Sequence, residues 1–392
     1  MSDLPTIDEA LAQVLAQAHP LAAEDVPVGR AAGRVMAEQA TAVTDLPPFD
    51  SSAMDGFAVR AADTPGRLSV VGQSAAGAPA QQELGAGQAI VISTGAVVPA
   101  GADAVVPVER TSGEVEVEAV SPGENIRPRG GDARIGDVVV EPGDVLRPAQ
   151  LGALAAAGIA TLRCARRPRV AVLATGTELR APGEPLAPGE IYESNTVLLT
   201  AQLESAGAEV TVLVAVSDDV RATRTAIERG LDHDVLVTSG GVSVGPHDLV
   251  RGALAELGAE EVFWRVAVKP GKPIAFAVRK GTLVFGLPGN PVSSLVGFEL
   301  FVRPALLALQ GAREPGPAYL PGLLGASVSR TAQRDELVRA RSSIEGGAVV
   351  LTPLTGQESH MIVRSAAASA LVLIPRGDGA LTEGAQVSYL RI

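Results

Sequence analysis

Cysteine is almost absent from this sequence, which has one, Cys164, among 392 residues. A single cysteine excludes a disulfide within the chain and any zinc or iron–sulfur site that needs several thiolates from one chain. This usage is typical of a reducing compartment, so we expect a cytoplasmic protein. Neighbouring arginines can lower the pKa of a thiol, but we interpret Cys164 as an inert residue.

Aromatic residues and long apolar runs are also scarce. Aromatics make up 3% of the chain and hydrophobic residues 46%, so the cores must be built mainly from Ala, Val and Leu. The longest apolar runs, residues 151–160 and 300–309, are shorter than the roughly 20 residues that cross a bilayer. Residues 1–18 have the pattern of an amphipathic helix and not of a targeting signal. We therefore expect no membrane contact.

Positive charge is also in deficit. The chain has 32 Lys and Arg but 44 Asp and Glu, which gives a formal net charge of -12 at pH 7. No basic stripe is present to offset repulsion from a phosphate backbone, so we expect no nucleic-acid partner. A small anionic ligand would need local donors that are strong enough to overcome the overall negative field.

The length of the chain allows two to four compact units. Thr6 and Glu9 form a capping box ahead of apolar residues at helical spacing, which predicts a first helix. Short β-type runs follow between residues 26 and 142, and a second helix is expected from Pro148 before a basic linker at 163–169. Residues 315–392 return to short strands, which predict a small β-barrel or sandwich.

Residues 169–311 alternate between strand and helix patterns. Such alternation is typical of right-handed βαβ units and predicts a mostly parallel, doubly wound sheet. The expected elements are strand 170–174, helix 195–206, strand 209–215, helix 221–229, strand 235–238, helix 248–257, strands 263–268 and 283–285, and a helix from Pro291.

Three loops follow predicted strands of this domain, at the edge where such sheets bind ligands. Glycines in the first two let several backbone N–H groups point at an anion, which suits a phosphate. Either loop alone is equally well explained as an ordinary tight turn, but together they favour binding. The first loop is Thr175-Gly176-Thr177-Glu178, and the second is Ser239-Gly240-Gly241-Val242-Ser243-Val244-Gly245.

The third loop, Gly286-Leu287-Pro288-Gly289-Asn290-Pro291, predicts a helix start with Asn290 as its cap. The free N–H groups of a helix start can bind an anion, although capping alone is the more common explanation. Nearby, Lys269-Pro270-Gly271-Lys272-Pro273 holds two lysines on a stiff frame. Two fixed cations can offset a polyanion, which favours binding.

Carboxylates in or beside loops are candidate magnesium ligands, because Mg²⁺ prefers hard oxygen donors and substrate phosphates. For any one of them a surface role is more common, and Asp55-Gly56 is also a common hairpin turn. His247 and His360 lie in no recognisable triad or metal spacing. The candidate carboxylates are Asp55, Glu178, Asp218, Asp219 and Asp248.

Several motifs stand in a specific order along the whole chain. They are Ser51-Ser52-Ala53-Met54-Asp55-Gly56-Phe57-Ala58, Ser93-Thr94-Gly95-Ala96, Gly123-Glu124-Asn125-Ile126-Arg127 with Gly131-Asp132, and residues 239–245, 268–273 and 286–294. This ordered set closely resembles the molybdopterin molybdenumtransferase family, which includes the bacterial MoeA proteins and the gephyrin E domain.

The resemblance implies an elongated, four-domain subunit and a homodimer, whose cleft lies between the α/β domain of one chain and the Asp55-bearing domain of the other. Asp55 and Thr94 would then act on the partner's substrate. The expected domains are a linking domain of residues 1–25, 43–50 and 143–168; a β-rich domain of 26–42 and 51–142 carrying Asp55 and Thr94; a molybdopterin-binding α/β domain of 169–312; and a C-terminal β-barrel of 313–392.

By the same resemblance, the substrate is molybdopterin carrying AMP, and the enzyme inserts molybdate with Mg²⁺, hydrolyses the adenylate and releases AMP. The dithiolene of the substrate would supply the sulfur ligands. The implied catalytic residues are Asp55, Lys269, Lys272 and Asp248; the magnesium ligands Asp55, Asp248 and Asp218 or its neighbour Asp219; and the molybdate ligands Lys272, Ser293, Arg334 and Ser359. The implied molybdopterin contacts are Thr94, Thr175, Gly176, Glu178, Ser239, Gly240, Gly241, Ser243, Gly245, Pro288, Asn290 and Ser293.

Some alternatives stay open. Residues 334–341 contain three arginines, and Leu337 stands where the family more often has an aromatic residue, so Arg334 is one candidate among three. Gephyrin-like relatives also organise partner proteins, which makes a molybdopterin-binding scaffold the second hypothesis. A hydrolase of nucleotide-like amides or anhydrides is a third, which the Asp55 region disfavours. The enzyme that adenylylates molybdopterin is a candidate partner, and tungstate has nearly the size and charge of molybdate.

Overall fold

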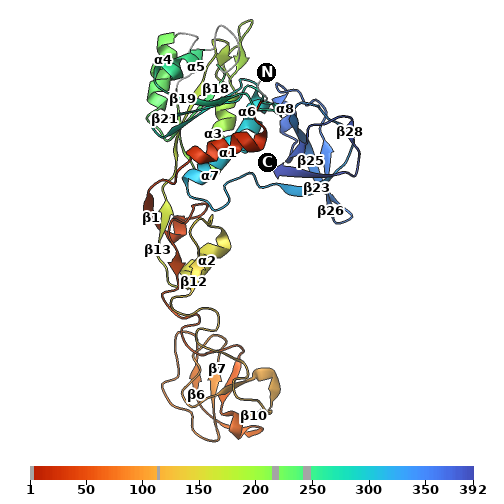
Figure 1. Ribbon diagram of the computed structural model, residues 1–392. Coiled ribbons are helices and arrows are strands. Elements are labelled where there is room, and N and C mark those ends of the chain that lie inside the picture. The colour runs from red at the N-terminus through yellow and green to blue at the C-terminus, as the bar shows by residue number, and fades with distance from the viewer. Residues whose placement is uncertain (1–3, 113–114, 214–219, 242–248) are drawn as a thin grey trace.

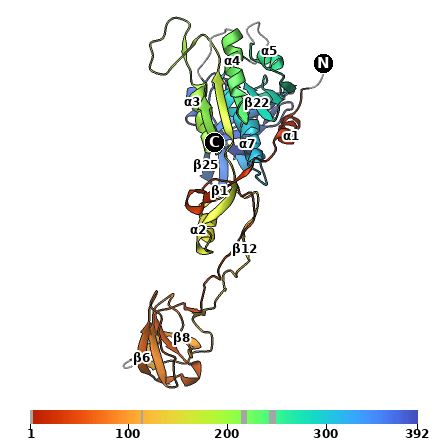
Figure 2. The same cartoon turned by 90° about the vertical axis from the view of Figure 1, so that its left-hand side faces the viewer.

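In a computed structural model, the structure describes residues 4–112, 115–213, 220–241 and 249–392. The chain is elongated (Figures 1 and 2). A small β lobe lies at one end, a narrow connecting part lies in the middle, and the α/β domain lies at the other end beside a C-terminal barrel. This agrees with the expected multidomain fold, whereas the domain boundaries given above stay predictions.

The central sheet has the strand order β17-β14-β18-β22-β21-β19. Its first four strands are parallel, and β21 runs antiparallel to both of its neighbours, so the sheet is mixed. The sequence patterns did not predict β21, which joins β22 through a tight turn at Lys280 and Gly281, where φ is 49° and 90°. The strands are β14 (Arg169–Ala174), β17 (Glu209–Val212), β18 (Val235–Ser239), β19 (Glu260–Trp264), β21 (Ala275–Arg279) and β22 (Thr282–Leu287).

Helices cover both faces of this sheet, because successive side chains of each strand point to opposite faces. Val170 and Val172 of β14 join one buried cluster, and Ala171 and Leu173 join the other. The doubly wound arrangement is therefore confirmed. The first cluster includes α1 (Ile7–Gln17), α3 (Asn195–Ser205), α6 (Pro291–Gly297) and α7 (Arg303–Leu309), and the second includes α4 (Val220–Gly230) and α5 (Leu249–Glu256).

Local sequence signals account for three of the helix starts. The Thr6–Glu9 capping box is present at α1, Pro148 is the first residue of α2 (Pro148–Ala156), and Pro291 is the first residue of α6. Together α6, the π-helical turn η4 (Phe298–Val302) and α7 make a helical stretch of 19 residues that is apolar enough to cross a membrane. Since 83% of its apolar window is buried inside the protein, it is a core helix.

The β lobe and the connecting part contain short, mostly antiparallel pairings. The lobe has a sheet of order β6-β7-β4-β8, made of β4 (Gly56–Val59), β6 (Ser69–Ser74), β7 (Gln88–Ile92) and β8 (Ala104–Pro107), and the short strands β3 (Ser51–Ser52), β5 (Gly66–Arg67), β9 (Thr111–Ser112), β10 (Glu116–Val117) and β11 (Ile126–Arg127). The connecting part has β1 (Ala23–Pro27) with β13 (Thr161–Ala165), β2 (Ala40–Thr41) with β12 (Val138–Val140), and α2 (Pro148–Ala156). The described residues of these parts also form the single 3-10 turns η1 (Val28–Arg30), η2 (Ala61–Asp63) and η3 (Val108–Arg110).

The predicted linker at 163–169 is wrong in its first part, because Arg163 to Ala165 belong to β13 and pair with β1. Cys164 lies in this strand and is 0% exposed. Burial raises the pKa of the Cys164 thiol, an effect larger than that of the nearby Arg34 charge. A buried thiol with a raised pKa is a poor nucleophile, in agreement with an inert residue.

The C-terminal domain is a closed barrel, as β25 pairs with β26 through its second half and with β27 through its first half. The strand predicted at 263–268 is corrected, since β19 ends at Trp264 and Val268 begins β20 (Val268–Lys269), which pairs with β25. The barrel strands are β23 (Leu320–Leu324), β25 (Asp335–Glu345), β26 (Ala348–Pro353), β27 (Ala370–Ile374) and β29 (Gln386–Arg391), accompanied by β24 (Val328–Ser329), β28 (Ala380–Leu381) and helix α8 (Ile362–Ser365).

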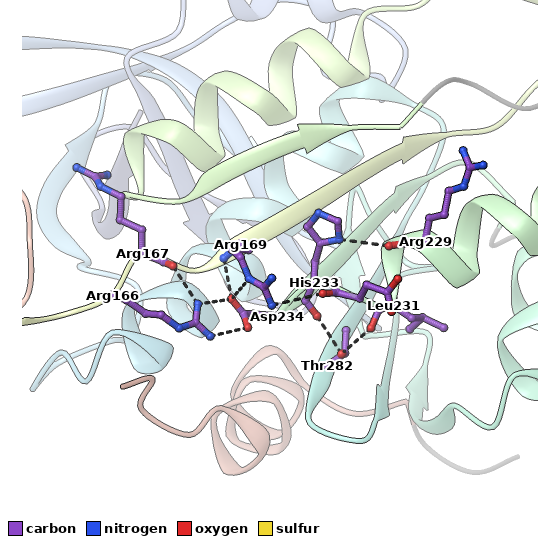
Figure 3. Close-up of polar contacts among 9 residues, drawn as sticks. Arg166, Arg167, Arg169, Arg229, Leu231, His233, Asp234 and Thr282 are labelled. Atoms are coloured by element: carbon purple, nitrogen blue, oxygen red, sulfur yellow. Dashed lines mark hydrogen bonds and ion pairs between the residues drawn. The ribbon is translucent and has the colours of Figure 1, made fainter. Parts of the chain in front are cut away.

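Asp234 joins the connecting part to the α/β domain at the amino ends of β14 and β18 (Figure 3). Arg166 donates two hydrogen bonds to its carboxylate, at 2.6 and 2.8 Å, and the Arg169 backbone N–H donates a third at 2.8 Å. Partial burial acts to raise the pKa of Asp234, but the hydrogen bonds and charges of the two arginines outweigh it and lower that pKa.

We expect Asp234→Asn to destabilise the protein by about 1–3 kcal/mol, the scale of losing hydrogen bonds to a charged group. Because the folded pKa of Asp234 is lowered, its stabilisation is fully present above the unfolded pKa of about 3.9 and is lost as the pH falls through the folded value. Urea denaturation at pH 7 and at pH 3 measures both effects. The exposed neighbour gives the control Asp232→Asn, and equal stability of the two variants would contradict this account.

Candidate functional site

The three glycine-containing loops meet at one edge of the sheet, because β14, β18 and β22 are adjacent and parallel. The Thr175 N–H donates to the Ser239 carbonyl at 3.1 Å, and the Gly240 N–H donates to the Leu287 carbonyl at 3.0 Å. Those predicted contact residues of the three loops that the structure describes therefore lie next to one another at the carboxyl ends of the strands, where ligands bind to such sheets.

Glycine is required in the second loop by both conformation and space. Gly240 and Gly241 have φ of 89° and 66°. A Cβ on Gly240 would lie 2.8 Å from the Thr175 carbonyl oxygen, and one on Gly241 would lie 2.5 Å from a Val250 methyl group. The loop can thus approach its neighbours, or a ligand, only with glycine at these positions. Ser243 and Gly245 lie outside the described residues.

Asn195, at the start of α3, connects two of the loops and was predicted only as a helix start. Its side-chain amide donates to the Ser239 hydroxyl and to the Gly289 carbonyl, both at 2.7 Å. The residue is 8% exposed, and its Oδ1 atom has no hydrogen-bond partner within the described part of the chain. Its only signal in the sequence is a polar residue at the start of a predicted helix, so its role depends on tertiary structure.

The third loop meets the barrel. Asn290 precedes α6 as predicted, but its side chain does not cap the helix and instead donates to the Ser359 hydroxyl at 2.9 Å. The Ser359 carbonyl accepts a hydrogen bond from the Val292 N–H at 3.1 Å. Ser293, on the first turn of α6, is 4% exposed. Asn290, Ser293 and Ser359 are therefore brought together, and Ser293 presents little surface to a ligand.

The two lysines of the Pro/Gly frame differ. Lys269 forms a 3.0 Å ion pair with Glu336 of the barrel, which partly neutralises its charge. Lys272 is exposed, and among the described residues the structure records no carboxylate within ion-pairing distance of it. Lys272 is thus the more available cation for an anionic ligand. Glu178 is also exposed at this edge, beside Gly176, whose φ is 152°.

The three arginines between residues 334 and 341 have different surroundings. Arg339 is 0% exposed and donates to the carbonyls of Gly356 and Met361, at 2.7 and 2.6 Å, and to the Ser365 hydroxyl at 2.9 Å. It holds the loop that presents Ser359 and cannot reach a ligand. Arg334 is half-buried and Arg341 is exposed, so these two remain candidates for binding an oxyanion.

The Asp55 motif lies in the β lobe. Asp55 accepts a 2.7 Å hydrogen bond from the Thr94 N–H, and both residues are exposed. The Gly123–Arg127 signature lies beside them, because β11 pairs with β3. Gly56 begins β4, where a Cβ would lie 2.0 Å from the Val106 carbonyl oxygen. Close strand packing, and not a hairpin turn, therefore explains the Asp-Gly pair.

Within one chain the two groups of residues are far apart. The β lobe that carries Asp55 and Thr94 lies at the opposite end of the molecule from β18 and β22 (Figures 1 and 2). Of the predicted magnesium ligands, Asp218 and Asp248 lie outside the described residues, as does the alternative Asp219. Across the described ranges, no cluster of three or more His, Cys, Asp or Glu is positioned to hold a metal ion.

Comparisons with known proteins cover nearly the whole chain. Family models match as the MoeA N-terminal region (domain I and II) over residues 5–158, a probable molybdopterin binding domain over 171–308, and the MoeA C-terminal region (domain IV) over 321–392. Molybdopterin molybdenumtransferase 2 of Mycobacterium tuberculosis is 38% identical over 384 residues, which cover 92% of this chain and 93% of that relative. The chain belongs to the molybdopterin molybdenumtransferase family.

Other members of this family agree in sequence and in structure. The molybdopterin molybdenumtransferase of Haemophilus influenzae is 36% identical over 98% of this chain and 97% of its own. The crystal structure of a MoeA protein of Pyrococcus horikoshii matches with a TM-score of 0.81 at 33% identity, covering 99% of each chain. The resemblance predicted from the motifs is thus confirmed, together with a role in molybdenum cofactor biosynthesis.

Arg339→Met should loosen the loop that carries Ser359, because the Gly356 and Met361 carbonyls and the Ser365 hydroxyl would lose their donor. We expect amide hydrogens of residues 356–365 and of Val292 to exchange about ten-fold faster or more, while the amides of the central sheet stay protected. Hydrogen exchange read by mass spectrometry measures this. Arg341→Met, at the exposed arginine of the same strand, is the control, and equal exchange in both variants would show that Arg339 does not hold the loop.

Proposed function

We propose that this protein inserts molybdenum into adenylylated molybdopterin, hydrolysing the adenylate and releasing AMP, and that it works as a homodimer. The separation of the motifs carries the proposal. Two groups of family motifs, around Asp55 and around the glycine loops, lie at opposite ends of one chain (Figure 1). A second copy of the chain, placed in the opposite direction, can bring its Asp55 lobe to the glycine loops of the first.

The glycine-loop edge has the chemistry that a phosphoanhydride requires. Backbone N–H groups of the loops and the exposed Lys272 are donors for phosphate oxygens. Fixed donors can stabilise the charge that develops as the anhydride is cleaved by water, so the protein needs no nucleophile of its own. This fits a chain whose single thiol is buried.

The same proposed site can hold Mg²⁺ with few protein ligands. Mg²⁺ is commonly held by one or two carboxylates together with substrate phosphates. Asp55 uses one carboxylate oxygen for the Thr94 N–H and is exposed, which leaves its second oxygen for the ion. Asp218 and Asp248 are the further proposed ligands. When bound, the ion would neutralise phosphate charge and position a water molecule.

Molybdate would bind between the third loop and the barrel. It is a tetrahedral oxyanion that needs cationic and hydroxyl donors. Lys272, Arg334 and the Ser359 hydroxyl are proposed as these donors, with Ser293 beside them. Tungstate has nearly the same size and charge and is expected to compete.

Asp55→Asn should lower molybdate-dependent AMP release by about 100-fold or more, the scale of losing one electrostatic stabiliser. The amide oxygen of Asn can still accept the Thr94 N–H, so the loop should keep its structure. Chromatographic detection of AMP released from adenylylated molybdopterin with Mg²⁺, and with molybdate or tungstate, measures the effect. Glu83→Gln, at an exposed carboxylate of the same lobe, is the control.

A molybdopterin-binding scaffold without turnover is the alternative function. It predicts that the wild-type protein binds the adenylylated substrate and releases no AMP with either oxyanion. That result would reject the proposed reaction. The next measurement would then be whether the protein binds the adenylylating enzyme.

A further inference from the structure

Arg265 has an unusual backbone for its position. Its φ is 77°, in the left-handed region, and it lies in the connection from β19 to β20, outside any hairpin turn. The Arg265 N–H donates to the Ile274 carbonyl at 2.8 Å, and the next N–H, of Val266, donates to the Lys272 carbonyl at 2.9 Å. Such a conformation costs about 1–2 kcal/mol in a non-glycine residue and is often found at functional sites.

The side chain of Arg265 is held by stacking. The guanidinium carbons of Arg251 and Arg265 each lie 3.9 Å from the centroid of the Trp264 ring. Arg251 is neutralised by Glu261 through hydrogen bonds of 2.8 and 3.0 Å. Within the described residues, Arg265 has no carboxylate partner.

Strand register places Arg265 at the ligand-binding edge. Trp264 aligns with Ala275, Ala275 with Gly286, and Gly286 with Thr238 across four neighbouring strands. The residue after Trp264 is therefore level with Leu287 and Ser239, where the glycine loops begin. Neighbouring strands are about 4.8 Å apart, so β19 lies roughly 14 Å from β18, within the length of a dinucleotide-like substrate.

We propose that Arg265, stacked on Trp264, binds the phosphate of the adenylate half of the substrate. This rests on the proposed function and adds the residue that recognises AMP. A guanidinium whose face is packed on an aromatic ring keeps its N–H edge free for two parallel hydrogen bonds to a phosphate. Its unpaired charge would offset the negative field of the protein at this end of the site.

Intrinsic fluorescence can test this in the full-length protein, because Trp264 is the only tryptophan. We expect AMP to change the emission in a saturable way. Adenosine should bind at least about ten-fold more weakly than AMP, because adenosine lacks the phosphate. Arg265→Gln should weaken AMP binding by about 10- to 100-fold, the scale of a charge-assisted hydrogen bond, with adenosine binding unchanged.

Two further variants make the test specific. Arg265→Lys keeps the charge without the planar group, so we expect it to lose AMP affinity to an intermediate extent. This variant replaces Arg265→Gln in the test if Arg265→Gln proves unstable. Arg229→Gln, at the amino-end side of the domain (Figure 3), is the control and should bind AMP like the wild type. Equal AMP affinity in folded Arg265→Gln and wild type overturns the assignment, even where molybdate-dependent AMP release is normal. Absence of that release in the wild type would instead reject the proposed function.

Discussion

The site depends on the side-by-side ends of three parallel strands, β14, β18 and β22. Their alignment brings backbone N–H groups from distant parts of the sequence to one edge, in a chain whose net charge of -12 disfavours anions elsewhere. Hydrogen bonds between the loops hold this edge, and Asn195 joins the Ser239 and Gly289 loops from the side. Without this framework, the glycines would be flexible turns with no common direction.

The barrel is part of the same framework. Its strand β25 pairs with β20, which carries Lys269, and Glu336 forms an ion pair with Lys269 near the exposed Lys272. Arg339 uses its buried charge to fix the loop that delivers Ser359 to Asn290. The position of the Ser359 hydroxyl thus depends on a buried guanidinium, which distinguishes Arg339 from the less buried Arg334 and Arg341.

Local patterns in the sequence predict much of this structure. The capping box at Thr6, Pro291 at a helix start and the strand–helix alternation depend on neighbouring residues, and all are present. Strand β21 was missed because it follows a Pro-rich loop and its pairing is decided by β22 and β19. The contacts of Asn195, and the buried position that sets Arg339 apart from Arg334 and Arg341, were missed for a related reason, since they join segments distant in sequence. The roles proposed for Asp55 and the lysines come from the family resemblance.

The central claim is that one active site is shared by two subunits, and a mixed dimer tests it most directly. Asp55→Asn and Lys272→Ala chains, carrying different tags, are co-expressed and purified as the heterodimer. A shared site predicts about half of the wild-type AMP release, because one of the two sites in a two-fold dimer then has both residues intact. Activity no higher than that of either variant alone would show that each chain builds its own site and would contradict the account.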